Sequence, residues 1–97
     1  MKHERVDILA TALLKYGRPM QMDMMIEEMS DLTKAMMKYR RNGHNRATVC
    51  KINEEMADVQ VMLDHMKIMF GDTDGEEAKK IRRLAERLGM GSEKRGG

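Results

Sequence analysis

The sequence predicts an all-α fold, a four-helix bundle with two long antiparallel central helices, and three observations support it. Apolar side chains recur at alternating steps of three and four residues, which is the period of a helix face. Residues that favour strands are scarce, with one Phe, two Tyr and no Trp among 97 residues. Hydrophobic residues make up 41% and charged residues 35% of the chain, a balance typical of amphipathic helices.

The first helix is expected over residues 3–16, where four apolar positions repeat at helical spacing. It should end at Gly17, which favours a helix C-terminus, with Pro19 just beyond. The repeated positions are Val6, Leu9, Leu13 and Tyr16.

The second helix is expected over residues 20–39 and should end before Gly43, where Arg40 and Arg41 suit the negative end of the helix dipole. Its expected apolar seam comprises Met22, Met25, Met29, Leu32, Met36 and Tyr39. The short connection that follows makes an antiparallel pairing with the next long helix the natural one.

The third helix is expected to begin between Asn45 and Thr48 and to end at Phe70, directly before Gly71. Its expected seam comprises Val49, Ile52, Met56, Val59, Leu63, Met66 and Phe70. We expect the three aromatic residues, Tyr16, Tyr39 and Phe70, to lie in the core.

A fourth helix is predicted by the acidic start at residues 72–77, where Thr73 with Glu76, or Asp74 with Glu77, has the capping-box spacing. Its apolar side comprises Ala78, Ile81, Leu84, Ala85 and Leu88. Residues 1–90 are therefore expected to form one helical domain, followed by a flexible C-terminal tail at 91–97. Because so short a chain buries little core, we expect oligomerisation to complete the bundle.

Composition excludes several classes of protein. The single Cys50 rules out an internal disulfide, and no apolar leader or 18-residue apolar run is present, so a cytoplasmic protein without membrane contact is expected. A net charge of +2 is too small to indicate nucleic-acid binding. The basic fourth helix also carries interspersed Glu residues, which disfavours that partner further.

A short acidic motif occurs twice, as EEMSDL at 27–32 and EEMADV at 54–59. Each copy places two carboxylates three residues apart, hence on one helix face. In both copies each acid precedes a seam residue, so the acids should lie about 100° to one side of the seam. In an antiparallel pair the two copies can share one edge of the interface and hold one or two cations. The four acids are Glu28, Asp31, Glu55 and Asp58.

The ligand chemistry favours Mg²⁺, with Mn²⁺ as the alternative, because every candidate ligand is a carboxylate oxygen. A helical di-iron site would need Glu-x-x-His, and no Glu stands three residues before His44 or His65. Mg²⁺ held by few carboxylates keeps several waters and typically meets substrate phosphates. The chain has no GxxxxGK[ST] loop, so it is not a P-loop enzyme.

The segments IEEMSDLTKAMMKYRR, INEEMADVQVMLDHMKIMF and KIRRLAERL resemble the MazG-like all-α nucleoside triphosphate pyrophosphohydrolases, in short single-domain members of bacterial and phage type. The resemblance covers about residues 5–88. It implies Mg²⁺-dependent hydrolysis of a (d)NTP to the (d)NMP and pyrophosphate, by a homodimer or homotetramer. It implies that the four metal ligands are Glu28, Asp31, Glu55 and Asp58, that the catalytic carboxylates are Glu27, Glu28 and Glu55, and that Lys80, Arg83 and Arg87 contact phosphates.

Two features depart from that family. Asp31 stands where the family usually has Glu, and because Asp is one methylene shorter, coordination there is expected to be looser or through water. The few aromatic residues also leave the base preference open. The alternative function is a catalytically silent helical module that binds a nucleotide, a metal or a partner protein through its Met-rich surface.

Overall fold

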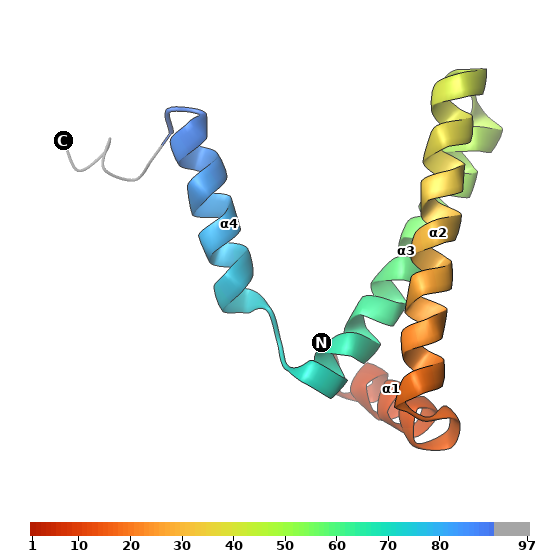
Figure 1. The fold of residues 1–97 in the computed structure, drawn as a ribbon, viewed down its shortest axis with the longest axis vertical. Coiled ribbons are helices and arrows are strands. Elements are labelled where there is room, and N and C mark those ends of the chain that lie inside the picture. Colours follow the sequence, from red (N-terminus) through yellow and green to blue (C-terminus); the bar gives the residue numbers. More distant parts are fainter. Residues whose placement is uncertain (91–97) are drawn as a thin grey trace.

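The computed structural model describes residues 1–90, which form four α-helices (Figure 1). The helices are α1 (His3–Tyr16), α2 (Arg18–Asn42), α3 (Arg46–Phe70) and α4 (Asp74–Arg87). The predicted all-α class with four helices is confirmed, and the tail predicted at 91–97 lies outside the described residues. None of the described helices combines the length and the apolar character needed to cross a membrane.

Helices α2 and α3 form a long antiparallel hairpin, and α1 crosses its open end (Figure 1). Each hairpin helix has 25 residues, so the prediction of two long central helices is confirmed. Helix α1 packs on both of them. An ion pair fixes its contact with α3, since Arg5 Nε donates to Asp64 Oδ2 at 2.8 Å. These three helices form the packed part of the molecule.

The helix ends follow local signals that the sequence carries. Gly17 adopts φ 86°, which favours glycine, and its N–H donates to the Leu13 carbonyl, as expected for the end of α1. Helix α2 is longer than predicted at both ends, since it begins at Arg18 and continues to Asn42. Pro19 lies in its first turn, where proline needs no backbone N–H partner and its fixed φ suits the helix.

The capping boxes differ from the prediction. Helix α3 begins with one that sequence reasoning missed, in which Asn45 Oδ1 accepts from the Thr48 N–H at 3.0 Å and Thr48 Oγ1 accepts from the Asn45 N–H at 3.3 Å. The boxes predicted for α4 are wrong, because Thr73 makes no side-chain cap bond to the backbone. Instead, Asp72 Oδ1 accepts a hydrogen bond from the Asp74 N–H at 3.1 Å, at the N-terminus of α4.

The packed faces of α2 and α3 are rotated from the predicted seams. The seam positions Met29, Met36 and Met56 are 50%, 45% and 47% exposed, whereas Ala35 and Met62, which the predicted seams omit, are buried. The predicted seam residue Met25 is buried as expected. Leu32, Ile52 and Val59 are half-buried, so the prediction was right for part of each seam. The methionines of α2 are spread widely around the helix rather than along one stripe, so periodicity alone does not select its packed face.

The expectation that all aromatic residues lie in the core is also corrected. Tyr39 is half-buried, but Tyr16 is 50% and Phe70 is 62% exposed. The Phe70 ring lies at the C-terminus of α3 and is covered on one face by the Arg18 guanidinium, 5.3 Å from the ring centroid. These rings therefore lie at the surface of the packed part rather than inside it.

Helix α4 does not pack against another helix in the part of the chain that the structure describes, and it projects away from the hairpin (Figure 1). An ion pair of 3.9 Å, Lys67 to Glu77, links its first turns to α3. Its apolar side stays open to solvent, with Ile81 65%, Leu84 45% and Leu88 64% exposed. The Cα radius of gyration of 17.5 Å exceeds the roughly 13 Å of a compact domain of this length.

Candidate metal centre

Three carboxylates converge where α2 meets α3. Glu28 and Asp31 come from α2 and Glu55 comes from α3, and one oxygen from each lies within 4.8 Å of the others. Helical spacing accounts for the α2 pair, since residues i and i+3 project from one face. Antiparallel packing of the hairpin then brings Glu55 opposite them. We call these three residues the carboxylate cluster.

Glu55 lies in the helix–helix interface rather than about 100° to one side of it as predicted, whereas Glu28 and Asp31 lie at the edge of the interface. Glu55 is only 7% exposed, and Glu28 and Asp31 are half-buried. The rotation of the packed faces described above accounts for this, because it replaces the predicted seam residues with the acids that precede them. Burial makes each charge more expensive to leave without a compensating cation.

Several negative charges lie close together in and beside the carboxylate cluster. The pKa of Glu28 is raised above its ordinary value by partial burial first, and then by the nearby charges of Asp58, Asp31 and Glu55. A hydrogen bond with Asp31 contributes in the same direction. A divalent cation is the species that would relieve this repulsion, because it interacts favourably with every carboxylate at once.

One lysine partly compensates the buried acid. Lys51 Nζ lies 3.2 Å from Glu55 Oε2, one helical turn away on α3. The hydrogen bond to Glu55 and the charges of Glu55 and Glu54 raise the pKa of Lys51, so its ammonium form is favoured. The Lys51 side chain is itself 58% exposed, and solvent therefore weakens the attraction.

The other acids of the two motifs lie outside the carboxylate cluster. Asp58 is exposed, although its charge still raises the pKa of Glu28. Glu27 is exposed on α2, next to Glu28 along the chain. Of the four predicted metal ligands the structure thus groups three, and the fourth lies at the edge.

A pocket of about 560 Å³ opens beside the carboxylate cluster. Asp31 and Glu55 form one part of its lining, and the remaining side chains are small or basic. They are Lys34, Ala35, Lys38, Ala47 and Lys51. Sequence reasoning missed these lysines, although their spacing was a usable signal: Lys34 and Lys38 follow Asp31 by three and seven residues, and Lys51 precedes Glu55 by four.

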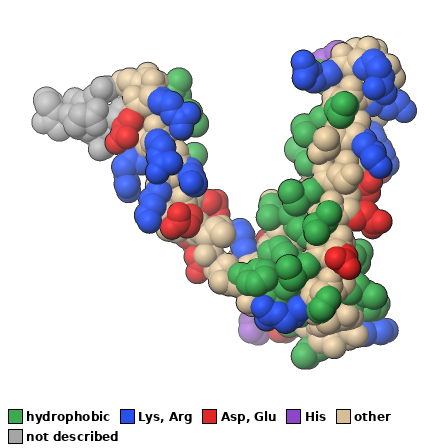
Figure 2. Space-filling model, in the orientation of Figure 1, with side chains coloured by type: hydrophobic (Ala, Val, Ile, Leu, Met, Phe, Trp, Pro, Cys, Tyr) green, Lys and Arg blue, Asp and Glu red, His purple; other side chains and the backbone are tan. Residues whose placement is uncertain are grey.

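The predicted phosphate-binding residues lie elsewhere. Lys80, Arg83 and Arg87 are exposed on α4, which does not pack against the hairpin within residues 1–90. Figure 2 shows the basic side chains of α4 on an arm separated from the hairpin. The single chain therefore does not bring these three residues to the carboxylate cluster.

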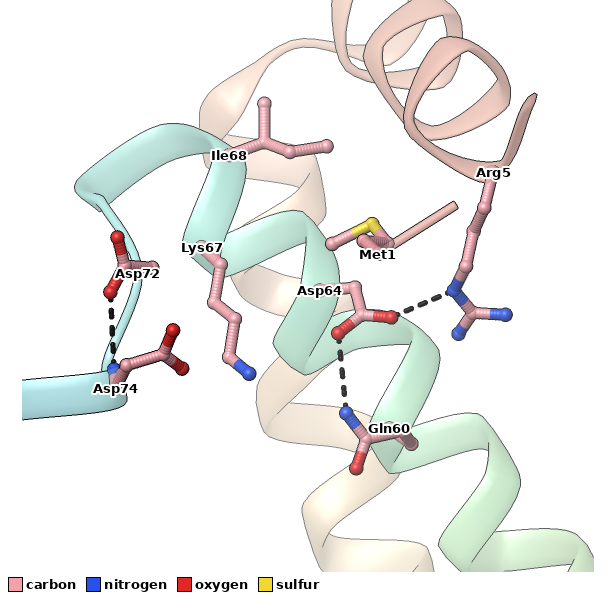
Figure 3. Close-up of a pocket in the computed structure, with 8 residues that line it drawn as sticks. All are labelled: Met1, Arg5, Gln60, Asp64, Lys67, Ile68, Asp72 and Asp74. Carbon is pink, nitrogen blue, oxygen red and sulfur yellow. Dashed lines mark hydrogen bonds and ion pairs between the residues drawn. The ribbon is translucent and has the colours of Figure 1, made fainter. Parts of the chain in front are cut away.

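A second pocket lies between α1, the C-terminal half of α3 and the start of α4 (Figure 3). The buried Asp64 carboxylate is central there, and it accepts from Arg5 at 2.8 Å and from Gln60 Nε2 at 3.2 Å. Both carboxylate oxygens are thus hydrogen-bonded within the protein. This arrangement ties α1 to α3, and it contains no member of the carboxylate cluster.

The residues of the carboxylate cluster fit a hard divalent cation such as Mg²⁺, since they offer only oxygen ligands from rigid helices. Acids alone would repel a phosphate, whereas the adjacent lysines supply charge of the opposite sign. Comparison of the chain with protein-family models, with curated proteins and with solved structures finds no match. The geometry of the hairpin and the motifs of the sequence therefore carry the functional argument.

Proposed function

We propose that this protein is an Mg²⁺-dependent nucleoside triphosphate pyrophosphohydrolase of the MazG-like type, which converts a (d)NTP to the (d)NMP and pyrophosphate. The observation that carries the proposal is the convergence of three carboxylates from two helices beside a basic pocket. An oxygen-only cation site next to ammonium groups matches the needs of a magnesium–triphosphate substrate.

Five of the six motif acids have a role in this proposal. Glu28, Asp31 and Glu55 hold the cation, and Asp58 adds negative charge at the edge of the same site. When bound, Mg²⁺, or Mn²⁺ in its place, would polarise a phosphoryl oxygen and lower the pKa of an attacking water. Glu27 is exposed beside the cluster and is the residue we assign to orienting that water. The catalytic carboxylates are then Glu27, Glu28 and Glu55.

We further propose that the protein works as a homo-oligomer, a dimer or a tetramer. Its described part buries few large apolar side chains, and a 14-residue helix such as α4 is marginal in water unless its apolar face is covered. Figure 2 shows hydrophobic side chains gathered on the hairpin on the side that faces α4. A second copy of the chain offers both an α4 and a hairpin with such open apolar faces, so each copy could cover the α4 of the other.

Light scattering coupled to size-exclusion chromatography tests the oligomer. The wild-type chain should elute at a multiple of 11.2 kDa, and the double variant I81D/L88D should shift toward the monomer mass. Arg82→Asp on the same helix, which alters charge without touching the apolar side, is the matched control. A monomeric wild-type protein would contradict this part of the proposal.

The activity is tested by incubating the purified protein with a panel of dNTPs and NTPs, with Mg²⁺, with Mn²⁺ and with EDTA. We expect release of pyrophosphate and of the nucleoside monophosphate, and no release of orthophosphate, only when a divalent cation is present. Absence of cleavage of every nucleotide with either cation would disprove the proposal.

The alternative, a helical module that binds without turnover, is favoured by the exposed methionines of α2, since Met-rich surfaces adapt to varied partners. Calorimetry separates the two functions. Binding of a magnesium–nucleotide without formation of pyrophosphate would support the silent module. Turnover of any panel member would exclude it.

A further inference from the structure

We propose that Lys34, Lys38 and Lys51 form the phosphate subsite, which binds the triphosphate chain of the substrate and the pyrophosphate product. This inference rests on the proposed function and assigns the subsite to the α2–α3 hairpin itself. It differs from the assignment that the family resemblance implies, which is to basic residues of α4.

The hairpin places the three lysines around one opening. Lys34 and Lys38 are four residues apart on α2 and therefore neighbours on one face. Lys51 lies opposite, on the first turns of α3, and all three line the pocket that contains Asp31 and Glu55. The buried Ala35 and the exposed Ala47 complete the lining, and their small side chains leave the space between the lysines open.

The charges of these lysines are largely uncommitted. In the described part of the chain no carboxylate lies within 4.0 Å of Lys34 Nζ or Lys38 Nζ, and Lys51 pairs with Glu55 alone. A cation bound by the carboxylate cluster would neutralise Glu55 and leave Lys51 without an anion to compensate. A phosphate chain extending from that cation would meet three ammonium groups, each able to donate charge-assisted hydrogen bonds.

The volume of the pocket is suited to this ligand. About 560 Å³ lies within the range of small-molecule sites, and the lining is polar where the cation and phosphates would lie. The basic residues of α4 would need a second copy of the chain to reach the same place, because α4 does not pack on the hairpin in the described residues. The lysines of the pocket need no such rearrangement.

The test measures binding of inorganic pyrophosphate by calorimetry, in the presence of Mg²⁺, to the full chain. The pocket variant K34Q/K38Q/K51Q is compared with the α4 variant K80Q/R83Q/R87Q, which loses the same three charges. Because charge-assisted hydrogen bonds to phosphate are among the strong ones, we expect the pocket variant to bind pyrophosphate at least about tenfold more weakly. The α4 variant should stay within about threefold of wild type, since each exposed charge there is worth little at a distance.

Two controls keep the result interpretable. The substituted side chains are exposed, so both variants should retain the helical circular dichroism spectrum of the wild type. The pocket variant should melt slightly lower, because it loses the ion pair between Lys51 and Glu55. The variant K34R/K38R/K51R keeps the charge and should retain pyrophosphate binding within about threefold. Binding of Mg²⁺ alone should persist in the pocket variant, because the carboxylates are untouched.

A loss of less than tenfold in the pocket variant would overturn the inference, as would an equal or larger loss in the α4 variant. Failure of the proposed function looks different: the wild type would then bind neither Mg²⁺ nor pyrophosphate and would cleave no nucleotide. A wild type that cleaves a dNTP, with a pocket variant that binds pyrophosphate normally, would refute the lysine subsite alone.

Discussion

The two copies of the acidic motif have nearly the same sequence but different positions in the fold. In EEMSDL both spaced acids, Glu28 and Asp31, are half-buried and belong to the carboxylate cluster. In EEMADV the first acid, Glu55, is buried in the cluster, whereas Asp58 is exposed outside it. The first copy therefore supplies two of the three clustered acids, and the second copy supplies one.

Helix rotation explains this difference. Three residues correspond to about 300°, so the second acid of each copy lies about 60° around its helix from the first. Helix α3 directs Glu55 toward α2, which turns Asp58 to solvent, whereas α2 presents both acids of its pair partly to the interface. A matched spacing in the sequence therefore does not ensure a matched environment, because each helix can rotate independently about its axis.

The largest expected effect separates the two acids of the second copy. If Glu55 is a central ligand, Glu55→Gln should lower kcat/KM by about 100-fold or more, since a lost cation ligand removes transition-state stabilisation of several kcal/mol. Asp58→Asn should lower it by about tenfold or less, because Asp58 acts on the site through its charge. Pyrophosphate release with an Mg²⁺ titration measures both. Equal losses would show that the two copies act symmetrically.

The second prediction concerns the stability effect of His65, which lies on nearly the same face of α3 as Asp58. His65 follows Asp58 by seven residues, close to two turns, yet His65 is 5% exposed because α1 covers that end of the hairpin. Within residues 1–90, neither ring nitrogen of His65 has a hydrogen-bond partner from the protein. A buried unsatisfied polar group costs about 1–3 kcal/mol, so His65→Leu should raise the melting temperature by roughly 4–8 °C.

Thermal unfolding followed by circular dichroism measures this effect. Asp58→Leu is the matched variant at the uncovered position. We expect a smaller gain there, because leucine would be exposed and only the repulsion between Asp58 and Glu28 would be relieved. A lower melting temperature for His65→Leu would contradict the assignment of His65 as an unsatisfied buried group.

The third prediction concerns repulsion within the carboxylate cluster. In EDTA, Glu28→Gln should raise the melting temperature by roughly 2–5 °C, because it removes one of several like charges held close together. The same variant should lose Mg²⁺ binding. Asp23→Asn, an exposed acid outside the cluster on the same helix, should change neither property. A Glu28→Gln protein that is less stable than wild type in EDTA would contradict the proposed repulsion.

The smallest expected effect is on the pH dependence of stability. The pKa of Glu28 is raised above its ordinary value of 4.5 in the folded protein, so the folded state binds this proton more tightly than the unfolded chain. The stability associated with that proton is fully present below the ordinary pKa and is lost as pH rises through the folded pKa. In EDTA, the melting temperature of wild type relative to Glu28→Gln should therefore fall as pH rises from about 4.5.

Excess Mg²⁺ should reverse that trend, because a cation that binds only the folded protein replaces the proton and binds more tightly as Glu28 ionises. Melting curves of both proteins across this pH range, with EDTA and with Mg²⁺, provide the measurement. An identical pH dependence of the two proteins in EDTA would show that Glu28 has the same pKa in both states.

Local patterns in the sequence predicted the four helices of this protein and most of their ends. Glycines 17, 43 and 71 follow the helices that they were expected to end, and the bounds of α1 and the end of α3 were predicted to the residue. The oxygen-only character of the motif acids was also evident from the sequence. These features depend on neighbours along the chain, because helical hydrogen bonds and caps join residues a few positions apart.

Only the tertiary structure decided which faces of the helices meet. It buried Glu55 but not Asp58, brought Lys34, Lys38 and Lys51 to one pocket, and left α4 apart from the hairpin. The physical reason is that the methionines of α2 are spread widely around the helix, so more than one rotation buries similar apolar area. The choice among those rotations depends on contacts between residues distant in sequence, which the spacing within one helix does not encode.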